Sequence, residues 1–420
     1  MSGPEASGGR STDATAGMLT GYRVLDLTQY LAGPGVTRLL AELDAEVIKI
    51  ELAPDGDGSR LLPWVRNGRS GFFVQHNTGK QSVCIDWSTD EGLGLIKRLA
   101  RGVDIVVENF GTAETLATRG LDYETLKGGN PGLIYLSISA FGRDSPWADK
   151  PGFDYVAQAA SGLMYMAGEP DSAPAIQWAA LGDGNAAVHG FAALGFALLH
   201  RERTGQGQFI DLAMTDCLFH FLDTALQAHH LSDGAYTAER YGVHHQLVFP
   251  AGNFKGPQGW ITVLALHRQW PNVCRALGRE DLIDDPRYAL MEDRTARRDE
   301  LVPIIEAWMA GFGSDEKVVE ALDRFRVPAC RVMPPVEAIG HPHFESRHMI
   351  RWIDDPVLGQ IPAPGFPFKF SAQPEQVEWR APLLGEHNRK VLSEAGLADA
   401  EIDDLLAQGV LVEGEPGSAR

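Results

Sequence analysis

The residues best suited to covalent chemistry lie in a short turn between two stretches of helical pattern. The run Gly168-Glu169-Pro170-Asp171-Ser172-Ala173-Pro174 places the carboxylate of Asp171 among glycine and prolines. A turn of this kind lies at the surface and can hold a side chain out toward a bound substrate. A carboxylate presented in this way can attack an activated acyl group and carry it covalently. The alternative is an ordinary turn residue, because Asp favours turns for its own backbone hydrogen bonds.

Two further carboxylates precede expected helices and are candidates for accessory roles. Asp154, in Gly152-Phe153-Asp154-Tyr155, comes just before a helical pattern over 156–166. Asp183 lies between two glycines before a long helix. Both positions suit an N-cap, which is the structural alternative for each. The start of the helix after Asp183 could equally hold an anion.

The histidines and cysteines do not form a metal-binding pattern. None of the 13 histidines belongs to an HExxH motif or a Cys/His box, so we expect surface or capping roles and no metal. His245, in the polar stretch 231–246, is kept as a possible accessory group. The four cysteines, Cys84, Cys217, Cys274 and Cys330, form no CxxC pair, and buried thiols in a reducing compartment are the expectation. A hydrolase triad lacks support because there is no GxSxG motif.

The composition of the 420 residues narrows the class of protein. Hydrophobic residues make up 44% and charged residues 22%, as in ordinary globular proteins. The formal charge of -19 argues against binding to nucleic acid or to anionic membranes. No secretory signal pattern is seen, and the apolar stretches are shorter than the roughly 20 residues of a membrane span. These features predict a cytoplasmic protein.

The elements needed to position these side chains are read from alternating apolar patterns. Strands are expected at 22–27, 46–51, 82–86, 104–108 and 133–138, with intervening helices that include 36–43 and 91–101, the latter capped by Ser88. This alternation predicts an α/β fold built on a large, open, doubly wound (Rossmann-like) parallel sheet. A dinucleotide site is not predicted, because no GxGxxG follows the first strand.

The second half of the chain changes character and predicts a second, smaller α+β domain. Helices are expected at 186–203, 214–230, 270–277, 299–309 and 386–408, and strands at 209–213 and 260–264. The predicted organisation is a disordered leader (1–19), the N-terminal part of the large domain (20–230), a linker (231–246), the small domain (247–330), a return linker (331–380) and a C-terminal helical part that packs on the large domain (381–420).

A set of collinear motifs resembles the family III CoA-transferases, the group of formyl-CoA transferase and carnitine CoA-transferase, related to α-methylacyl-CoA racemase. The motifs cover about 20–410 and include Ala32-Gly33-Pro34 after the first strand, Glu46 to Glu51, Asn77 to Asp86, Val107-Glu108-Asn109-Phe110, Pro151 to Asp154, the Asp171 turn, Gly182-Asp183, Arg203 to Gln208 and Ala381 to His387. Each motif alone is weak, but nine in the same order are specific.

The resemblance implies an enzyme of the CoA-transferase type and a role for particular residues. Asp171 falls on the nucleophile of the family, which forms a mixed anhydride and then an aspartyl-CoA thioester. The residues implied in binding the CoA ester are Tyr30, Leu31, Ala32, Lys80, Asn109, Phe110 and, at a slightly different spacing, Arg119. The resemblance also implies an interlocked-ring homodimer, CoA thioesters and carboxylic acids as substrates, and no permanently bound cofactor.

Two features differ from formyl-CoA transferase. Leu31 stands where that enzyme has a glutamine that orients the reacting carboxylate, and no glycine-rich loop is evident between His245 and Trp260. These differences argue against exchange between formyl-CoA and oxalate. An apolar Leu31 is compatible with a larger, less polar acyl group.

Two alternative functions remain open from the sequence. A racemase would use Asp154 with an upstream histidine for proton transfer at the α-carbon, but no histidine lies between His76 and His189. A non-catalytic protein that binds CoA esters would have no need for Asp171 in its turn. The transferase is therefore the preferred prediction.

Overall fold

The computed structural model describes residues 16–373 and 379–414, so most of the predicted leader lies outside the described residues. Contacts divide the chain into two compact units. The first unit contains Met1–Ser161, Gln177–Phe221 and Pro342–Arg420, and the second contains Gly162–Ile176 and Leu222–His341. Each unit is described below by itself.

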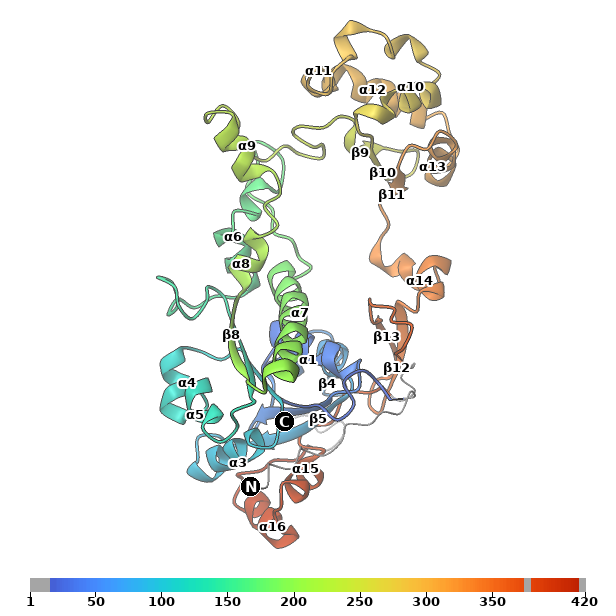
Figure 1. Ribbon diagram of the computed structural model, residues 1–420. Coiled ribbons are helices and arrows are strands. Elements are labelled where there is room, and N and C mark those ends of the chain that lie inside the picture. Colours follow the sequence, from blue (N-terminus) through green and yellow to red (C-terminus); the bar gives the residue numbers. More distant parts are fainter. Residues whose placement is uncertain (1–15, 374–378, 415–420) are drawn as a thin grey trace. The chain divides into compact units, whose positions relative to one another are not determined.

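The first unit is built on a six-stranded sheet in which every neighbouring pair is parallel (Figure 1). The order is β5 (Lys80–Ile85), β2 (Glu46–Leu52), β1 (Arg23–Leu27), β6 (Ile105–Glu108), β7 (Ile134–Ser139) and β8 (Gln208–Ala213). The central strands are apolar and buried on both faces, as parallel strands usually are. This order reverses direction between β1 and β6, and it confirms the predicted doubly wound α/β fold.

Helices cover both faces of this sheet. One face packs against α3 (Asp90–Ala100), α4 (Ala113–Arg119), α5 (Tyr123–Lys127), α15 (Asn388–Glu394) and α16 (Asp399–Ala407). The other carries α1 (Ala32–Ala41) and the long α7 (Leu181–Thr204). A Cβ at Gly190 of α7 would lie 2.9 Å from Val36 and 3.0 Å from Leu136, so glycine permits the close approach of α7 to α1 and the sheet.

The remaining elements of the first unit are short. They are the helices α2 (Gly71–Asn77), α6 (Asp154–Ala160), α8 (Met214–Phe219) and α14 (Pro342–Ser346), a 3-10 turn (Gly58–Leu61), and the hairpins β3 (Val65–Arg66) with β4 (Arg69–Ser70) and β12 (Ile350–Asp355) with β13 (Gly359–Pro364).

The C-terminal segment of the first unit covers the β5 edge of the sheet. Ile85 forms an antiparallel bridge with Leu411, the Val412 N–H donates to the Cys84 carbonyl at 3.2 Å, and the His387 N–H donates to the Ser82 carbonyl at 2.9 Å. These bonds satisfy backbone groups that an edge strand otherwise leaves open.

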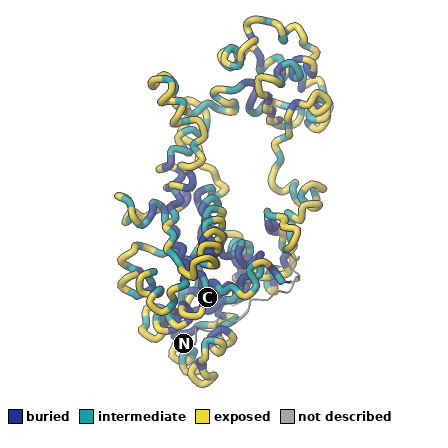
Figure 2. Tube along the Cα trace, in the orientation of Figure 1, coloured by how far each residue is buried: buried dark blue, intermediate teal, exposed yellow. Residues whose placement is uncertain are grey.

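The second unit has a three-stranded antiparallel sheet in the order β11 (Ala329–Arg331), β10 (Trp260–Leu264), β9 (Ala251–Lys255). Its helices are α9 (Ala225–Leu231), α10 (Trp270–Leu277), α11 (Met291–Ala296), α12 (Arg298–Met309) and α13 (Asp315–Arg324). Aromatic and aliphatic side chains from the sheet and from α10, α12 and α13 form its own core, seen as buried segments in Figure 2. This unit is therefore of the α+β type.

Three predicted helices differ in detail from the structure. Thr89, not Ser88, caps α3, because its hydroxyl accepts the Gly92 N–H while the Ser88 hydroxyl binds Asp86. The expected helix over 214–230 is two helices, α8 and α9, and the break falls where the first unit ends and the second begins. The C-terminal pattern over 386–408 is also divided, between α15 and α16, at Gly396 with its φ of +85°.

Two other sequence expectations can be compared with the structure. Cys84, Cys217 and Cys274 are buried as expected, whereas Cys330 is exposed because it lies on β11, a strand at the edge of the small sheet. Within residues 16–373 and 379–414, no helix has the length and apolar character needed to span a membrane.

Candidate functional site

The site begins at the carboxyl ends of β1 and β6, where the strand order reverses. In open α/β sheets this is the crevice in which ligands bind. Asn109, directly after β6, donates from Nδ2 to the Gln29 carbonyl at 2.8 Å and accepts the Gln29 N–H at Oδ1, also at 2.8 Å. The predicted residues Tyr30 and Asn109 therefore follow two neighbouring strands whose loops are joined by these bonds.

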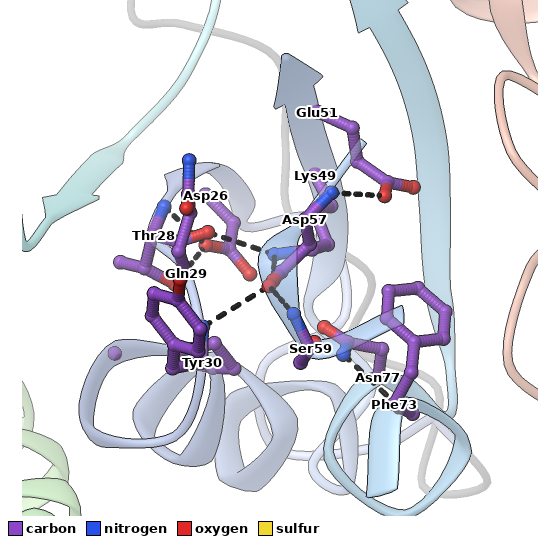
Figure 3. Close-up of polar contacts among 12 residues, drawn as sticks. Asp26, Thr28, Gln29, Tyr30, Lys49, Glu51, Asp57, Ser59, Phe73 and Asn77 are labelled. Carbon is purple, nitrogen blue, oxygen red and sulfur yellow. Dashed lines mark hydrogen bonds and ion pairs between the residues drawn. The ribbon is translucent and has the colours of Figure 1, made fainter. Parts of the chain in front are cut away.

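Tyr30 has an unusual backbone conformation that a buried carboxylate maintains. Its φ is +65°, and its N–H donates to Asp57 Oδ1 at 3.1 Å (Figure 3). Its ring packs edge-on against Phe153, and a Cβ on Gly58 would lie 2.6 Å from its hydroxyl. The ring of Tyr30 is therefore held between these neighbours while remaining 39% exposed.

Leu31 and Ala32 form the start of α1. Leu31 occupies the N-cap position without a side-chain cap, and Ala32 is the first helical residue and is buried. The N–H groups of an uncapped first turn can donate hydrogen bonds to an anionic ligand. This places the predicted segment 30–32 at a helix start beside the strand-order reversal.

A buried charge network supports this end of the sheet, and Figure 3 labels Asp26, Lys49, Glu51 and Asp57 of this network. We define the strand-end network as the carboxylates and cations that alternate there, which are Asp26, Lys49, Glu51, Asp57, Arg60 and Lys80. Lys49 Nζ lies 2.8 Å from Asp57 Oδ2, and Lys80 Nζ lies 2.9 Å from Asp26 Oδ2. Because each buried charge has a partner of opposite sign, burial does not leave an uncompensated ion.

The pKa directions of Asp26 and Glu51 indicate that these two carboxylates are ionised. Burial would raise the pKa of Glu51, but Arg60, hydrogen-bonded to both of its oxygens, holds that pKa at about 2. Burial would also raise the pKa of Asp26, but the charges of Lys80 and Lys49 keep that pKa well below its usual range. The network therefore acts as a fixed set of charges at neutral pH.

Lys80 is engaged inside this network, and the geometry does not support the direct contact with CoA that we predicted. Its ammonium group donates to Asp26, to the Pro34 carbonyl and to Asn77, and its side chain is fully buried. Burial lowers the pKa of Lys80 to about 8, although Asp26 acts in the opposite direction. Lys80 thus joins α1 to β1, a role that its position in the Asn-x-x-Lys motif does not reveal.

Phe110 and Arg119 meet on one indole ring that the sequence analysis did not single out. The centroid of the Phe110 ring lies 4.5 Å from that of Trp87, and the Arg119 guanidinium carbon lies 4.5 Å from the Trp87 ring centroid. A guanidinium over an indole face is a favourable cation–π contact. The stack joins two of the predicted CoA contacts through Trp87.

Asp154 and Asp183 are brought together at the start of α7. Asp154 Oδ1 accepts the N–H groups of Gly182 and Asp183, and Oδ2 accepts from Gln158 Nε2 at 2.7 Å. Asp154 therefore does not cap its own helix α6, whose N-cap position is Phe153, but caps α7. Burial, with a contribution from Asp154, raises the pKa of Asp183 to about 7.

Asp171 lies in the second unit, in a turn that is held by its neighbours. Gly168 has a φ of +117°, the Ala175 N–H donates to the Ala167 carbonyl at 2.9 Å, and the Ser172 hydroxyl donates to the Glu169 carbonyl at 2.9 Å. The Asp171 side chain is exposed and accepts no hydrogen bond from any described residue. The structure therefore fixes the backbone of the turn and leaves the carboxylate open to solvent.

His245, the remaining predicted accessory residue, is also exposed in the second unit. Its Nδ1 accepts the Leu247 N–H at 3.0 Å. In the part of the chain that the structure describes, no group of three or more His, Cys, Asp or Glu side chains is arranged to hold a metal ion.

Comparison with known proteins identifies relatives over nearly the whole length. The family model of CoA-transferase family III matches residues 19–388. A succinyl-CoA–D-citramalate CoA-transferase of Chloroflexus aurantiacus is 35% identical over 94% of this chain and 98% of its own. A succinate–glutarate CoA-transferase of Agrobacterium fabrum is 34% identical over 90% and 95%. The crystal structure of a CaiB/BaiF family protein from Brucella suis superimposes with a TM-score of 0.79 at 32% identity, covering 90% of this chain and 100% of that one.

Proposed function

This chain belongs to CoA-transferase family III, and from that premise we propose that Asp171 carries coenzyme A between two carboxylic acids. The protein is an enzyme that moves CoA from an acyl-CoA to an acid acceptor. The observation that carries the assignment of the nucleophile is the exposed, unbonded carboxylate in a turn whose backbone is fixed.

The proposed reaction passes through two kinds of covalent intermediate on Asp171, a mixed anhydride and a thioester. The Asp171 carboxylate attacks the thioester carbonyl of the donor and expels CoA thiolate, which leaves a mixed anhydride. The thiolate attacks the Asp171 carbonyl, which forms an aspartyl-CoA thioester and releases the donor acid. The acceptor carboxylate then attacks this thioester, and the thiolate returns to the acceptor carbonyl to give the new CoA ester and free Asp171. Covalent catalysis divides one difficult transfer into easier steps, and none of them needs a resident cofactor.

We propose that the CoA ester binds at the carboxyl ends of β1 and β6. Tyr30, Leu31 and Ala32 would contact it at the start of α1, where backbone N–H groups are uncapped. Asn109 and Phe110 would contact it from the loop after β6, with Arg119 as the cationic neighbour. Lys80 supports this surface from inside through Asp26 and Pro34.

For the substrates, we propose succinyl-CoA as donor and a dicarboxylic acid of similar size as acceptor. The names of the two relatives described above both contain succinate or its CoA ester together with a second dicarboxylic acid. Leu31, in place of a polar side chain, is consistent with an acyl group larger than formyl.

We also propose that the enzyme is a cytoplasmic homodimer, interlocked as the family resemblance implies. Its helix α7 exposes Val188, Phe196 and Leu199, of which Phe196 is 74% exposed. A helix with apolar residues all round is normally buried, so a second copy of the chain is the expected cover. Sedimentation equilibrium should give twice the chain mass.

Intact-mass measurement tests the nucleophile directly. The enzyme is mixed with succinyl-CoA without acceptor and weighed after acid quench. We expect the mass of CoA less one water on the wild type and none on Asp171→Ala, with Asp323→Ala, at an exposed carboxylate of α13, as a control that keeps the adduct. An adduct that persists in Asp171→Ala would overturn the assignment.

Racemisation is distinguished in the same samples. Asp154 oxygens are already engaged with Gly182, Asp183 and Gln158, which favours transfer over proton abstraction by Asp154. Exchange of the α-proton of a 2-methylacyl-CoA for solvent deuterium, without movement of CoA between acids, would support the racemase instead.

A further inference from the structure

We propose that Arg143, in the loop after β7, is a positioning residue that fixes the loop 109–111 for the CoA ester. The inference rests on the proposed CoA contacts of Asn109 and Phe110. The motif comparison did not include Arg143, which lies 34 positions beyond Asn109 in the sequence. Its function would be to hold the main chain of the loop rather than to touch the substrate.

The guanidinium group of Arg143 binds the loop at two carbonyl groups and binds the end of β6 at Glu108. Nη2 donates to the Phe110 carbonyl at 2.6 Å and to Glu108 Oε2 at 3.1 Å, and Nη1 donates to the Gly111 carbonyl at 2.5 Å. Since the planar guanidinium has a fixed fork of donors, these bonds determine the direction of both carbonyl groups. One side chain therefore holds the carbonyl groups of two consecutive loop residues, Phe110 and Gly111.

Glu108 completes this arrangement from the end of β6. It is fully buried, and its Oε2 accepts the Phe110 N–H at 2.8 Å. Phe110 thus has its N–H bound to the carboxylate and its carbonyl bound to the cation of a single ion pair. Because the two charges compensate each other, removing Arg143 alone would leave a buried carboxylate without a cation.

Arg143 is itself fixed from the neighbouring strands. Its Nε donates to the Ser137 hydroxyl of β7 at 2.7 Å, and its backbone N–H donates to Asp211 Oδ2 of β8 at 2.7 Å. A continuous path of hydrogen bonds therefore runs from β8 through Arg143 to the loop, and on from Asn109 to Gln29 beside Tyr30.

A cavity borders the ion pair of Arg143 and Glu108, so packing is incomplete on that side of these two side chains. It has a volume of about 250 Å³ and is lined by Glu108 and Arg143 together with Leu116, Tyr123 and Phe209. A side chain that borders a cavity lacks neighbours on that side and loses the packing contacts that would otherwise restrain it. The hydrogen bonds of Arg143 take over this restraint.

The experiment compares Arg143→Met and Arg143→Lys with the matched variant Arg201→Met. Arg201 is buried to a similar degree, pairs with Asp104 and donates to the carbonyls of Asp104 and Gly132, but these groups precede β6 and β7 at the opposite end of the strands. Both methionine variants lose an ion pair and bonds to two carbonyl groups, and Arg143→Met also loses the bond from Nε to the Ser137 hydroxyl. Only Arg143→Met alters the loop 109–111.

We expect Arg143→Met to weaken binding of free coenzyme A, measured by titration calorimetry, by at least about tenfold, which corresponds to one charge-assisted hydrogen bond. KM for succinyl-CoA should rise in parallel while kcat changes little. The CoA affinity of Arg143→Lys should lie between those of the wild type and Arg143→Met. Arg201→Met should bind CoA as the wild type does. The unfolding midpoint of Arg143→Met should fall further than that of Arg201→Met, because Glu108 is fully buried whereas Asp104 is partly exposed.

Wild-type affinity for CoA in a folded Arg143→Met protein would overturn the inference, as would equal loss of affinity in Arg201→Met. Calorimetry with free CoA does not depend on turnover, so this result is separable from failure of the proposed reaction. If Asp171→Ala kept full activity while Arg143→Met lost CoA affinity, the nucleophile assignment would fail and the role of Arg143 would stand.

Discussion

The strand-end network and the Asp171 turn use carboxylates in opposite ways. Asp26 and Glu51 are fully buried, and each accepts several hydrogen bonds and faces a cation. Asp171 is exposed and accepts no hydrogen bond within the described chain. The first arrangement commits every carboxylate oxygen to structure, whereas the second keeps the oxygens available.

The difference follows from what each region must do. A surface that binds an anionic ester has to be fixed before the ligand arrives, because ordering it on binding would cost affinity. A nucleophile must instead retain the lone pair that attacks. Substitutions in the network should therefore affect mainly stability, and substitutions in the turn mainly catalysis.

The largest effect is expected from Asp171→Asn. The amide cannot form the anhydride, so kcat for CoA exchange should fall by about a thousandfold or more, the range typical for loss of a covalent nucleophile. The unfolding midpoint in urea should stay that of the wild type, because no described group donates to this side chain. A large loss of stability would show that Asp171 is a structural turn residue after all.

Lys80→Met tests the opposite case. It leaves Asp26 buried beside only Lys49, and breaking a buried pair in this way costs about 3–5 kcal/mol of unfolding free energy. The matched variant is Lys127→Met, whose pair with Glu124 is exposed and screened by solvent, so its loss should change stability very little. Urea unfolding followed by tryptophan fluorescence compares them, and equal losses would contradict the proposed role of the network.

Asp183 is a third case, a largely buried carboxylate that lies beside another carboxylate, Asp154, rather than beside a cation. Its pKa of about 7 exceeds the unfolded value, so the folded state binds the proton more tightly and loses stability as pH rises from about 4 to about 7. The loss should reach roughly 2–4 kcal/mol, at about 1.4 kcal/mol per unit. Asp183→Asn should remove this pH dependence, and identical pH profiles for both proteins would refute the assignment.

The smallest effect is expected from Ser172→Ala. The Ser172 hydroxyl donates to the Glu169 and Ala173 carbonyls across the turn, and its removal should cost the turn about 1 kcal/mol. Because the turn is exposed, the free energy of unfolding of the whole protein should change little. In contrast, kcat should fall several-fold. The matched variant is Ser88→Ala in the first unit, because the Ser88 hydroxyl likewise donates within its own exposed turn, to Asp86. This control should leave kcat unchanged, and an equal loss of kcat in both variants would contradict a specific role for the Asp171 turn.

Much of the first unit could be predicted because its strands carry a strong local signal. The runs at Val24-Leu25, Val47-Ile48 and Ile105-Val106 are apolar on consecutive residues, which is typical of strands buried on both faces. Helix ends were harder to predict, since Ser88 and Thr89 are chemically alike and only the backbone decides which hydroxyl reaches Gly92.

The candidate site could be predicted only in part, because its contacts join residues distant in sequence. Asp154 looks like the cap of the helix that follows it, yet it caps α7, which begins 27 residues later. Lys80 looks like a surface cation, yet its partner Asp26 is 54 positions away. One signal could have been noticed: Glu108, at the end of a buried strand, requires a cation, and Arg143 supplies it.

The segment that pairs with β5 has a consequence for how the chain is made. Leu411 and Val412 are translated more than three hundred residues after Cys84 and Ile85, whose backbone groups they cover. Throughout synthesis this border of the sheet stays open, and open strand borders recruit other chains. A nascent chain stalled before position 411 should therefore precipitate more readily, and depend more on chaperones, than the released product.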